Sequence, residues 1–412
     1  MARKADPPPQ HLPTPAPLPQ APLDDAQRLA CLRLIRSENV GRATFRQLIN
    51  HYGGATNALQ ALPELSRRGG RGKPLRICSV AVAEAELEAV ARIGARILFT
   101  IEPDYPPLLA QLEIPPPLIY VRGRRDLLTR PGIAIVGSRD ASAAGRTMAR
   151  NLASDLGRKG LVTVSGLARG IDAEAHQATL ATGTIAVLAG GLDVVYPPEN
   201  AALHQRIGEE GCLVSLEPPG FTPRGRDFPR RNEIISGIAN AVLVIEAASR
   251  SGTLITARFA NEQGREVFAV PGHPLDPRAD GTNQLIKNGA TMVTSAADVL
   301  EALGPTLQPR YTFRETDPGA WKPPDESATT VSHRAHDNLA STGPMSSAVD
   351  SDAARSIVLH ALGPAPVNID ELVRVSGLAA RVVQATILEL ALAGRIERHG
   401  LNLVSLIPDT NG

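Results

Sequence analysis

"IAIVGSRDASAAG", residues 133–145, decides the fold of this chain. An apolar, β-branched run ends in Gly137, and an Ala- and Arg-rich stretch compatible with a helix follows it. This strand–glycine–helix order is the layout in which backbone amides and a helix N-terminus receive a phosphate. The dinucleotide-binding fingerprint needs two further glycines, but Arg139 and Ser142 stand at their positions. The stretch therefore predicts a Rossmann-like unit whose phosphate ligand is not a dinucleotide.

Further strand-like runs lie on both sides of this stretch, and helix-length segments separate most of them. Their residue ranges are 95–100, 118–123, 161–166, 184–191, 212–216, 241–247 and 266–272. Apolar runs spaced in this way are typical of a parallel sheet that is covered on both faces. We therefore expect a doubly wound α/β domain, an extended Rossmann-like sheet, over residues 81–303.

The flanking segments differ in composition from this domain. Residues 1–23 are Pro-rich and are interpreted as a disordered leader, and residues 24–80 as a helical domain of the SAM or helix-hairpin-helix type. Residues 304–351 are rich in Pro, Ser, Thr and Asp and predict a linker. Residues 352–408 have the order of a winged helix, whose third helix has few polar residues. That helix favours protein contacts, or a degenerate DNA reader, over sequence-specific binding.

Bulk composition limits the possible functions. The formal net charge of +1 gives no global signature of a polyanion-binding protein, so any basic site must be local. The three cysteines, Cys31, Cys78 and Cys212, are far apart and form neither a disulfide framework nor a zinc site. That cysteine usage is typical of the cytoplasm. No window approaches the ~18 uninterrupted apolar residues of a membrane span. We predict no metal and no cofactor.

Glycine-bearing loops follow four of the predicted strands, at residues 136–142, 165–176, 189–200 and 248–257. In a doubly wound sheet, loops at the carboxyl ends of strands converge on one crevice. A fifth segment, residues 222–237, carries four arginines around Phe228. Backbone amides, hydroxyls, guanidinium groups and an aromatic ring are suited to a phosphodiester with a base to stack.

These blocks resemble the DNA-processing protein A (DprA/Smf) family. The resemblance rests on "IAIVGSR", "VSGLARGIDAEAH", "GGLDVVYPPEN", "FPRRNEIISG", "SGTLITARFA", "GREVFAVPG" and "GTNQLIKNGA", and it covers residues 95–303. It implies a non-enzymatic, homodimeric protein that binds single-stranded DNA, protects it during natural transformation and loads the RecA recombinase. It also implies that Arg139, and Arg230 or Arg231, contact the DNA backbone. Glu233 departs from the family pattern, where a third basic residue is usual.

The predicted DNA-binding set combines the resemblance with the positions of the loops. It comprises Gly137, Ser138, Arg139, Gly166, Arg169, Arg226, Phe228, Arg230, Arg231, Asn232, Ser251, Gly252, Thr253 and Lys287.

Two other function classes compete with this interpretation. A nucleotide hydrolase of the cytokinin-activating (LOG-like) group would need a catalytic Glu where Thr256 stands. The second alternative is an interaction scaffold that binds no DNA. Asp172 and His176 are spaced i, i+4 without a visible third ligand, so we expect Asp172 to form hydrogen bonds or cap a helix. Glu246 ends a strand near the crevice, and we expect it to hold the 249–253 loop.

Overall fold

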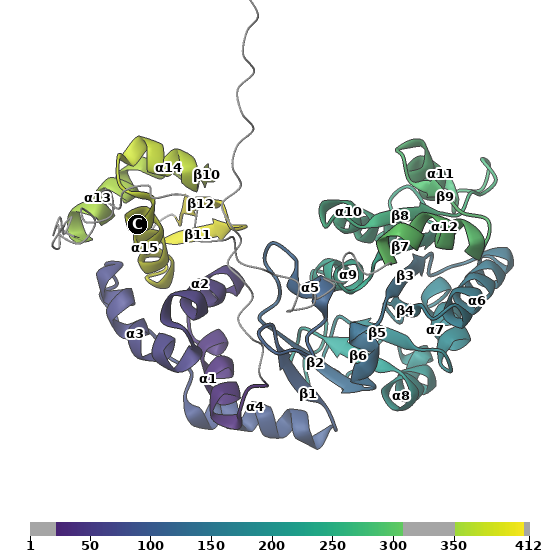
Figure 1. Ribbon diagram of the computed structural model, residues 1–412, viewed down its shortest axis with the longest axis horizontal. Coiled ribbons are helices and arrows are strands. Elements are labelled where there is room, and N and C mark those ends of the chain that lie inside the picture. The colour runs from purple at the N-terminus through teal and green to yellow at the C-terminus, as the bar shows by residue number, and fades with distance from the viewer. Residues whose placement is uncertain (1–21, 308–350, 408–412) are drawn as a thin grey trace, which may run out of the picture.

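The computed structural model describes residues 22–307 and 351–407 in three parts (Figure 1). A helical N-terminal domain and a C-terminal winged helix lie together on one side, and a large α/β domain lies on the other. The predicted leader and linker fall almost entirely outside the described residues. The fold class is the one predicted, a Rossmann-like domain flanked by a helical domain and a winged helix.

A nine-stranded sheet with the order β1-β2-β6-β5-β4-β3-β7-β8-β9 forms the α/β domain. Its strands are β1 (Arg96–Phe99), β2 (Leu118–Gly123), β3 (Gly132–Gly137), β4 (Val162–Ser165), β5 (Thr184–Leu188), β6 (Cys212–Ser215), β7 (Ala241–Ile245), β8 (Glu266–Ala269) and β9 (Thr291–Met292). In the run β6-β5-β4-β3-β7-β8-β9, each strand pairs in parallel with its neighbour, as predicted. The two strands at the other edge, β1 and β2, pair antiparallel, so the sheet is mixed.

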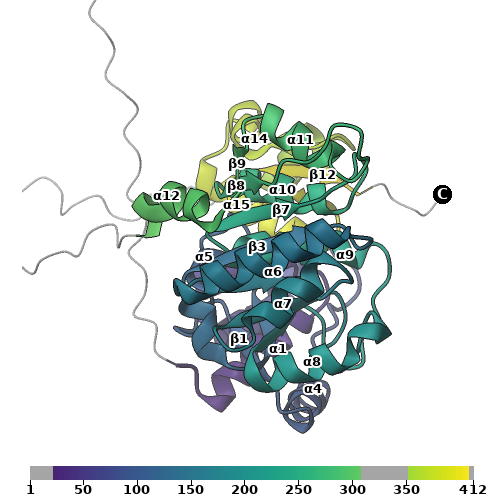
Figure 2. The same cartoon turned by 90° about the vertical axis from the view of Figure 1, so that its right-hand side faces the viewer.

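Helices cover both faces of the sheet (Figure 2). Ile133 and Ile135 of β3 pack with α6 (Ala143–Arg158), α7 (Ile171–Thr179) and α12 (Ala296–Leu307). Ala134 and Val136 point to the other face and pack with α9 (Asp227–Ile238) and α10 (Thr253–Glu262). This alternation follows from the two-residue period of a strand. The remaining elements of the domain are α5 (Pro107–Ala110), α8 (Ala201–Glu210), α11 (Asp280–Lys287) and two short 3₁₀ helices, Arg125–Thr129 and Pro198–Asn200.

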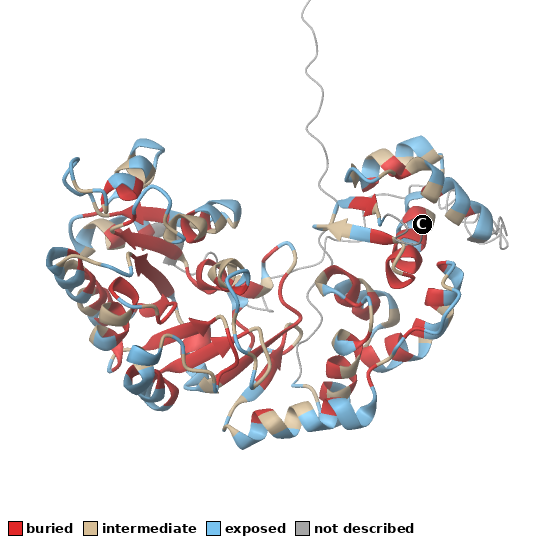
Figure 3. Ribbon diagram, turned by 180° about the vertical axis from the view of Figure 1, so that it is seen from behind, coloured by how far each residue is buried: buried red, intermediate tan, exposed pale blue. Residues whose placement is uncertain are grey.

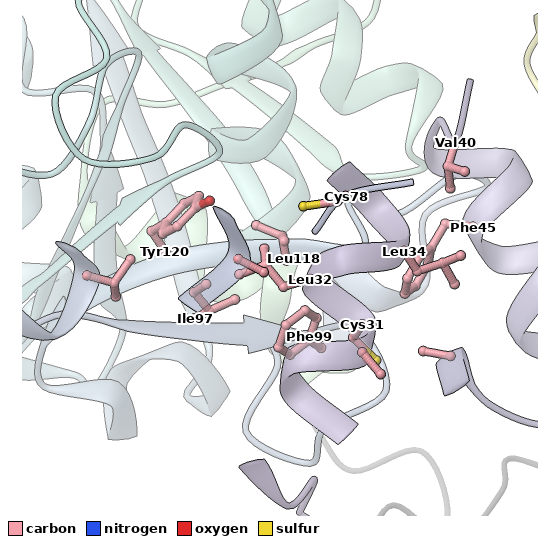
Figure 4. Packing of buried hydrophobic residues seen from close by; sticks show 14 of the residues in the cluster. Cys31, Leu32, Leu34, Val40, Phe45, Cys78, Ile97, Phe99, Leu118 and Tyr120 are labelled. Atoms are coloured by element: carbon pink, nitrogen blue, oxygen red, sulfur yellow. The ribbon is translucent and has the colours of Figure 1, made fainter. Parts of the chain in front are cut away.

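The N-terminal domain contains α1 (Asp25–Arg36), α2 (Arg42–Tyr52), α3 (Ala55–Arg68) and α4 (Val80–Arg92). Its apolar core is continuous with one face of the β1–β2 pair, where Phe99 packs beside Leu32 (Figure 4). Arg28 of α1 forms a buried ion pair with Glu102 and donates to the carbonyl of Ile97. These contacts fix the helical domain to the edge of the sheet.

The winged helix consists of α13 (Ser351–Ala361), α14 (Ile369–Ser376), α15 (Ala380–Leu392) and a sheet of β10 (Val367–Asn368), β12 (Leu403–Leu406) and β11 (Ile396–His399). Within residues 22–307 and 351–407, no single helix is both long and apolar enough to cross a membrane. Helices α14 and α15 reach that length and hydropathy only when taken together, and they meet at a bend of 116°.

Candidate functional site

The carboxyl ends of β5, β4, β3 and β7 lie side by side in the sheet, so the four predicted loops meet at one edge. Glycines allow two of these loops to touch. A Cβ at Gly137 would overlap the carbonyl oxygen of Ile245 and lie 2.6 Å from Cγ1 of Ile171. Gly170 has a φ of 75° and packs against the carbonyl oxygens of Ser138 and Arg139. Gly137 therefore serves close packing between strand and loop, and Arg139 beyond it is exposed.

Phe228, in the first turn of α9, stands between two arginines. The guanidinium carbon of Arg139 lies 5.6 Å from the centre of the Phe228 ring, and that of Arg231 lies 5.8 Å from it. Both distances fall in the range of cation–π attraction. The ring of Tyr196 lies 5.5 Å from that of Phe228, centre to centre, and is tilted by 58°. Sequence reasoning missed Tyr196, although it lies in the predicted third loop.

A cavity opens on each side of this arginine–phenylalanine group. One has a volume of about 220 Å³ and includes Tyr196 and Gly190 in its lining. The other has a volume of about 550 Å³ and includes Asn232, Arg250 and Thr253. The residues that line both are Arg139, Ala168, Phe228 and Arg231. Arg250, an exposed arginine beside the second cavity, was also missed.

Arg231 is only 7% exposed, and the buried carboxylate of Asp172 lies near it. A Cβ at Gly166 would overlap Nη1 of Arg231, so the glycine leaves the space that the guanidinium fills. Asp172 accepts hydrogen bonds from the amides of Gly166 and Ala168 at 3.1 and 3.3 Å, as expected of a hydrogen-bonding residue. Burial lowers the pKa of Arg231 to about 10, so it remains a cation at neutral pH. Its Nε has no hydrogen-bond partner in the described structure.

Beside this pair, His176 is fully buried. Its Nε2 accepts from the amide of Leu167 at 3.3 Å, and its Nδ1 lies 2.7 Å from Oγ1 of Thr184. Burial lowers the pKa of His176 to about 3, and the positive charge of Arg231 adds to the effect. Burial also raises the pKa of Asp172, against the opposing influence of Arg231 and the two amides. Asp172 and His176 thus stabilise the loop at residues 165–176 by accepting hydrogen bonds from its backbone amides.

The loop that follows β7 is tied to the loop that follows β3. The Oγ1 of Thr253 donates to the carbonyl of Gly137 at 3.1 Å, and Ser251 Oγ donates to Thr253 Oγ1 at 3.0 Å. The side-chain amide of Asn232 donates to the carbonyl of Gly252 at 3.3 Å. These residues line the larger cavity.

The other predicted site residues differ in position. Arg169 lines the smaller cavity and lies 3.7 Å from a carboxylate oxygen of Glu199. Arg226 and Arg230 are exposed but line neither cavity, so of the two alternatives Arg231 is the residue at the centre. Lys287 lies elsewhere, in a separate cavity of about 360 Å³.

Two carboxylates that the sequence analysis singled out have partners outside the Phe228 group, and for Glu246 this differs from expectation. Glu246 does not bind the 249–253 loop; it accepts from the amide of Ser142 at 2.9 Å and from its hydroxyl. Because Ser142 caps α6, the carboxylate lies at the positive end of that helix. Glu233 lines neither of the two cavities beside Phe228; it pairs with Arg42 of the N-terminal domain at 3.1 Å. The negative charge at the departure from the family pattern is therefore turned away from the Phe228 group.

In the part of the chain that the structure describes, no group of three or more His, Cys, Asp and Glu side chains could hold a metal ion. The crevice instead offers buried and exposed guanidinium groups, backbone amides and two aromatic rings. That combination can bind phosphate groups and stack a flat ring.

Comparison with known proteins gives consistent matches in all three parts. Residues 96–304 match the family described as DNA recombination-mediator protein A. Residues 25–89 match the DprA-like N-terminal HHH domain, and residues 342–400 match the DprA winged helix domain.

Similar individual proteins carry the same names. The sequence is 36% identical to Protein Smf of Synechocystis sp., over 76% of this chain and 80% of that protein. It is 46% identical to DNA processing protein DprA of Streptococcus pneumoniae, over 48% of this chain and 70% of that protein. The X-ray structure of DNA processing protein A from S. pneumoniae superposes with a TM-score of 0.58 at 34% identity. That superposition covers 67% of this chain and 96% of that one.

Proposed function

Because the chain belongs to the DNA recombination-mediator protein A (DprA/Smf) family, we propose that it binds single-stranded DNA at the carboxyl edge of its sheet. In this proposal it protects incoming DNA and loads RecA onto it during homologous recombination or natural transformation. The bound strand crosses the group formed by Arg139, Phe228 and Arg231.

One observation carries this proposal: Arg231 is a largely buried cation that lines both cavities and lies against an aromatic ring. A buried charge without a full set of hydrogen bonds is costly unless a ligand completes it. A phosphodiester oxygen in the crevice would bind the part of the guanidinium that lines the cavities, and a base stacked on Phe228 or Tyr196 would cover the ring.

Preference for single strands follows from the shape of the crevice. The bases of a duplex are already stacked on one another, so their faces are not available to Phe228 and Tyr196. Phosphate and ring contacts also carry little sequence information, because every base has a π-face. We therefore expect weak sequence preference and strong dependence on salt.

We propose that the protein is not an enzyme. Thr256, which stands where the related hydrolases have a catalytic Glu, is a buried residue on the wall of the larger cavity. The nearby carboxylate of Glu246 is engaged by Ser142 at the start of α6. Release of free base from AMP that disappears in Glu246→Gln would contradict this part of the proposal.

We propose a homodimer that forms through the α/β domain. Strand β9 forms one edge of the sheet, and Met292 on it is 54% exposed. Leu275, in the loop before α11, is 86% exposed. Apolar side chains at a sheet edge support contact with another copy. The three cysteines are free and buried, which is consistent with the proposed cytoplasmic location.

The decisive experiment compares single-stranded and duplex oligonucleotides of equal length in a salt titration of binding. We expect tighter binding of the single strand. Arg139→Ala should weaken binding of all sequences alike and lower the salt slope by about one unit, as loss of one phosphate contact does. Arg158→Ala is the matched control, because Arg158 is exposed at the far end of α6. Equal affinity for both oligonucleotides, or no effect of Arg139→Ala, would contradict the proposal.

A further inference from the structure

The winged helix packs on the N-terminal domain through α15, the helix that would read DNA in a DNA-binding winged helix (Figures 1 and 3). Seven consecutive residues of its C-terminal half, 386–392, are buried. A helix that is buried all round has no free face for another partner. Only the first turns of α15 remain exposed, at Arg381 and Gln384 among others.

Helix α15 belongs to two apolar cores at once. Val383, Ile387 and Leu390 lie in the core of the winged helix. Leu388 and Leu392 lie instead in the core cluster of the N-terminal domain, which includes Leu62 and Leu65 of α3. The contact is therefore an apolar interface with residues from both domains.

Backbone approach at this interface is very close. A Cβ at Gly69, directly after α3, would overlap the carbonyl oxygen of Glu389 and lie 2.8 Å from Cβ of Ala393. The φ of Gly69 is −66°, so the glycine is needed for space and not for an unusual backbone conformation. A neighbouring glycine, Gly72, has nothing within 4 Å of its Cβ position.

Polar contacts surround this apolar centre. The side-chain amide of Asn39, in the turn between α1 and α2, donates to the carbonyl of Leu392 at 2.9 Å. Arg398 of β11 donates to Oε1 of Gln47 at 2.6 Å, and Arg355 of α13 donates to the carbonyl of Arg68. The turn between α1 and α2 is thus in contact with the winged helix.

The charge of the winged helix also argues against DNA. Residues 351–407 contain no lysine, and their arginines are matched in number by acidic residues. The arginines are Arg355, Arg374, Arg381, Arg395 and Arg398, and the acidic residues are Asp352, Asp370, Glu371, Glu389 and Glu397. Duplex-binding modules depend on a surplus of positive charge for most of their affinity.

We propose that this winged helix is a protein-docking module: its third helix binds the chain's own N-terminal domain and does not read duplex DNA. Docking places β11 and the turn at Gly400 along a cleft of about 950 Å³, whose other walls come from the N-terminal and α/β domains. The winged helix thereby stabilises the arrangement of the N-terminal domain at this cleft. The proposal does not depend on DNA binding at the Phe228 group.

The test uses the full chain, with hydrogen–deuterium exchange and binding to a duplex oligonucleotide as two readouts. Gly69→Ala inserts a methyl group into the interface, and Gly72→Ala adds the same group in open space. We expect Gly69→Ala to accelerate amide exchange in both α3 and the 386–392 segment of α15. We expect Gly72→Ala to leave exchange at the wild-type rate. Neither variant should gain affinity for the duplex.

Two results would overturn the proposal. Unchanged exchange in Gly69→Ala would mean that α15 is not held by α3. Faster exchange together with at least tenfold tighter duplex binding would mean that docking hides a DNA reader. If Gly69→Ala does not fold, Arg355→Ala replaces it, because it removes a contact at the edge of the interface. Arg374→Ala is then the control, since Arg374 is exposed and pairs within α14.

Discussion

The guanidinium of Arg231 occupies the space that a side chain at position 166 would fill, and Gly166 leaves that space open. The two residues come from different elements, the loop after β4 and the middle of α9. The backbone amide of the same Gly166 donates to Asp172, so the glycine contributes both a void and a donor. The relationship explains how a cation is accommodated beneath the crevice.

Gly166→Ala should therefore impair binding of single-stranded DNA nearly as much as Arg231→Ala. The added methyl group displaces the guanidinium from its place against Phe228, and one phosphate contact corresponds to about one unit of salt slope. Salt-dependent fluorescence anisotropy measures the effect. Gly225→Ala is the control, since that glycine lines the larger cavity but has nothing within 4 Å of its Cβ position. Normal binding by Gly166→Ala would show that Arg231 acts from another position.

Removal of an aromatic ring should cost binding energy without changing the charge of the site. Phe228→Leu should weaken binding by about 1–3 kcal/mol, the range found for stacking of one base. Tyr196→Leu should have a smaller effect, because Tyr196 is 48% exposed and lines the smaller of the two cavities alone. Neither substitution should alter the salt slope. A changed slope with unchanged affinity would indicate that these rings position arginines and do not stack bases.

Glu233→Arg should leave DNA binding unchanged, because the Glu233 carboxylate pairs with Arg42 and lines neither cavity beside Phe228. Both side chains of this pair are about a quarter exposed, so a double-mutant cycle of unfolding free energies should give a coupling below about 1 kcal/mol. A clear gain in DNA affinity for Glu233→Arg would instead place this position on the path of the strand.

Glu246→Ala should destabilise the protein by about 1 kcal/mol, since it removes the carboxylate that binds Ser142 at the start of α6. Thermal or urea unfolding measures the loss. Glu262→Ala is the control, because Glu262 is exposed and pairs with Arg258, one turn away in the same helix. Equal stability of the two variants would mean that the contact with Ser142 contributes nothing.

His176 should make the folded state sensitive to acid. Its pKa of about 3 lies below the ordinary value, so between these values the unfolded chain binds a proton that the folded chain does not. Stability is then complete above about pH 6.5 and falls as the pH is lowered, by at most about 1.4 kcal/mol per pH unit. In His176→Gln this contribution to the pH dependence of the unfolding free energy should disappear, as measured by urea unfolding between about pH 3 and pH 6.5. Asp172 titrates in both proteins, so its opposite contribution cancels in the difference.

Much of the fold could be predicted because its signals are local. The apolar runs that end in Gly137, Gly166 and Gly190 predict buried strands and the loops that follow them. The antiparallel pairing of β1 and β2 could not be predicted in the same way. An apolar run shows that a strand is buried, but the direction of its neighbour depends on the path of the chain between them.

The meeting of the predicted loops at one edge of the sheet could be predicted for a similar reason. Parallel strands bring their carboxyl ends to one edge, so the loops carrying Arg139, Gly166 and Thr253 were expected to meet. Neither the choice between Arg230 and Arg231 nor the place of Lys287 could be read from spacing. Helix phase and packing determine which of two adjacent arginines points into the crevice.

The sequence by itself determined which residues form strands, helices and glycine loops, because those depend on side-chain periodicity and local backbone geometry. Only the tertiary structure decided the partners of charged and buried groups. In it, Glu233 pairs with Arg42, Glu246 accepts a hydrogen bond from Ser142, and Leu388 of the winged helix packs in the core of the N-terminal domain. Each of these contacts joins residues distant in the chain, and their approach is fixed by how whole elements pack, which no short stretch of sequence specifies.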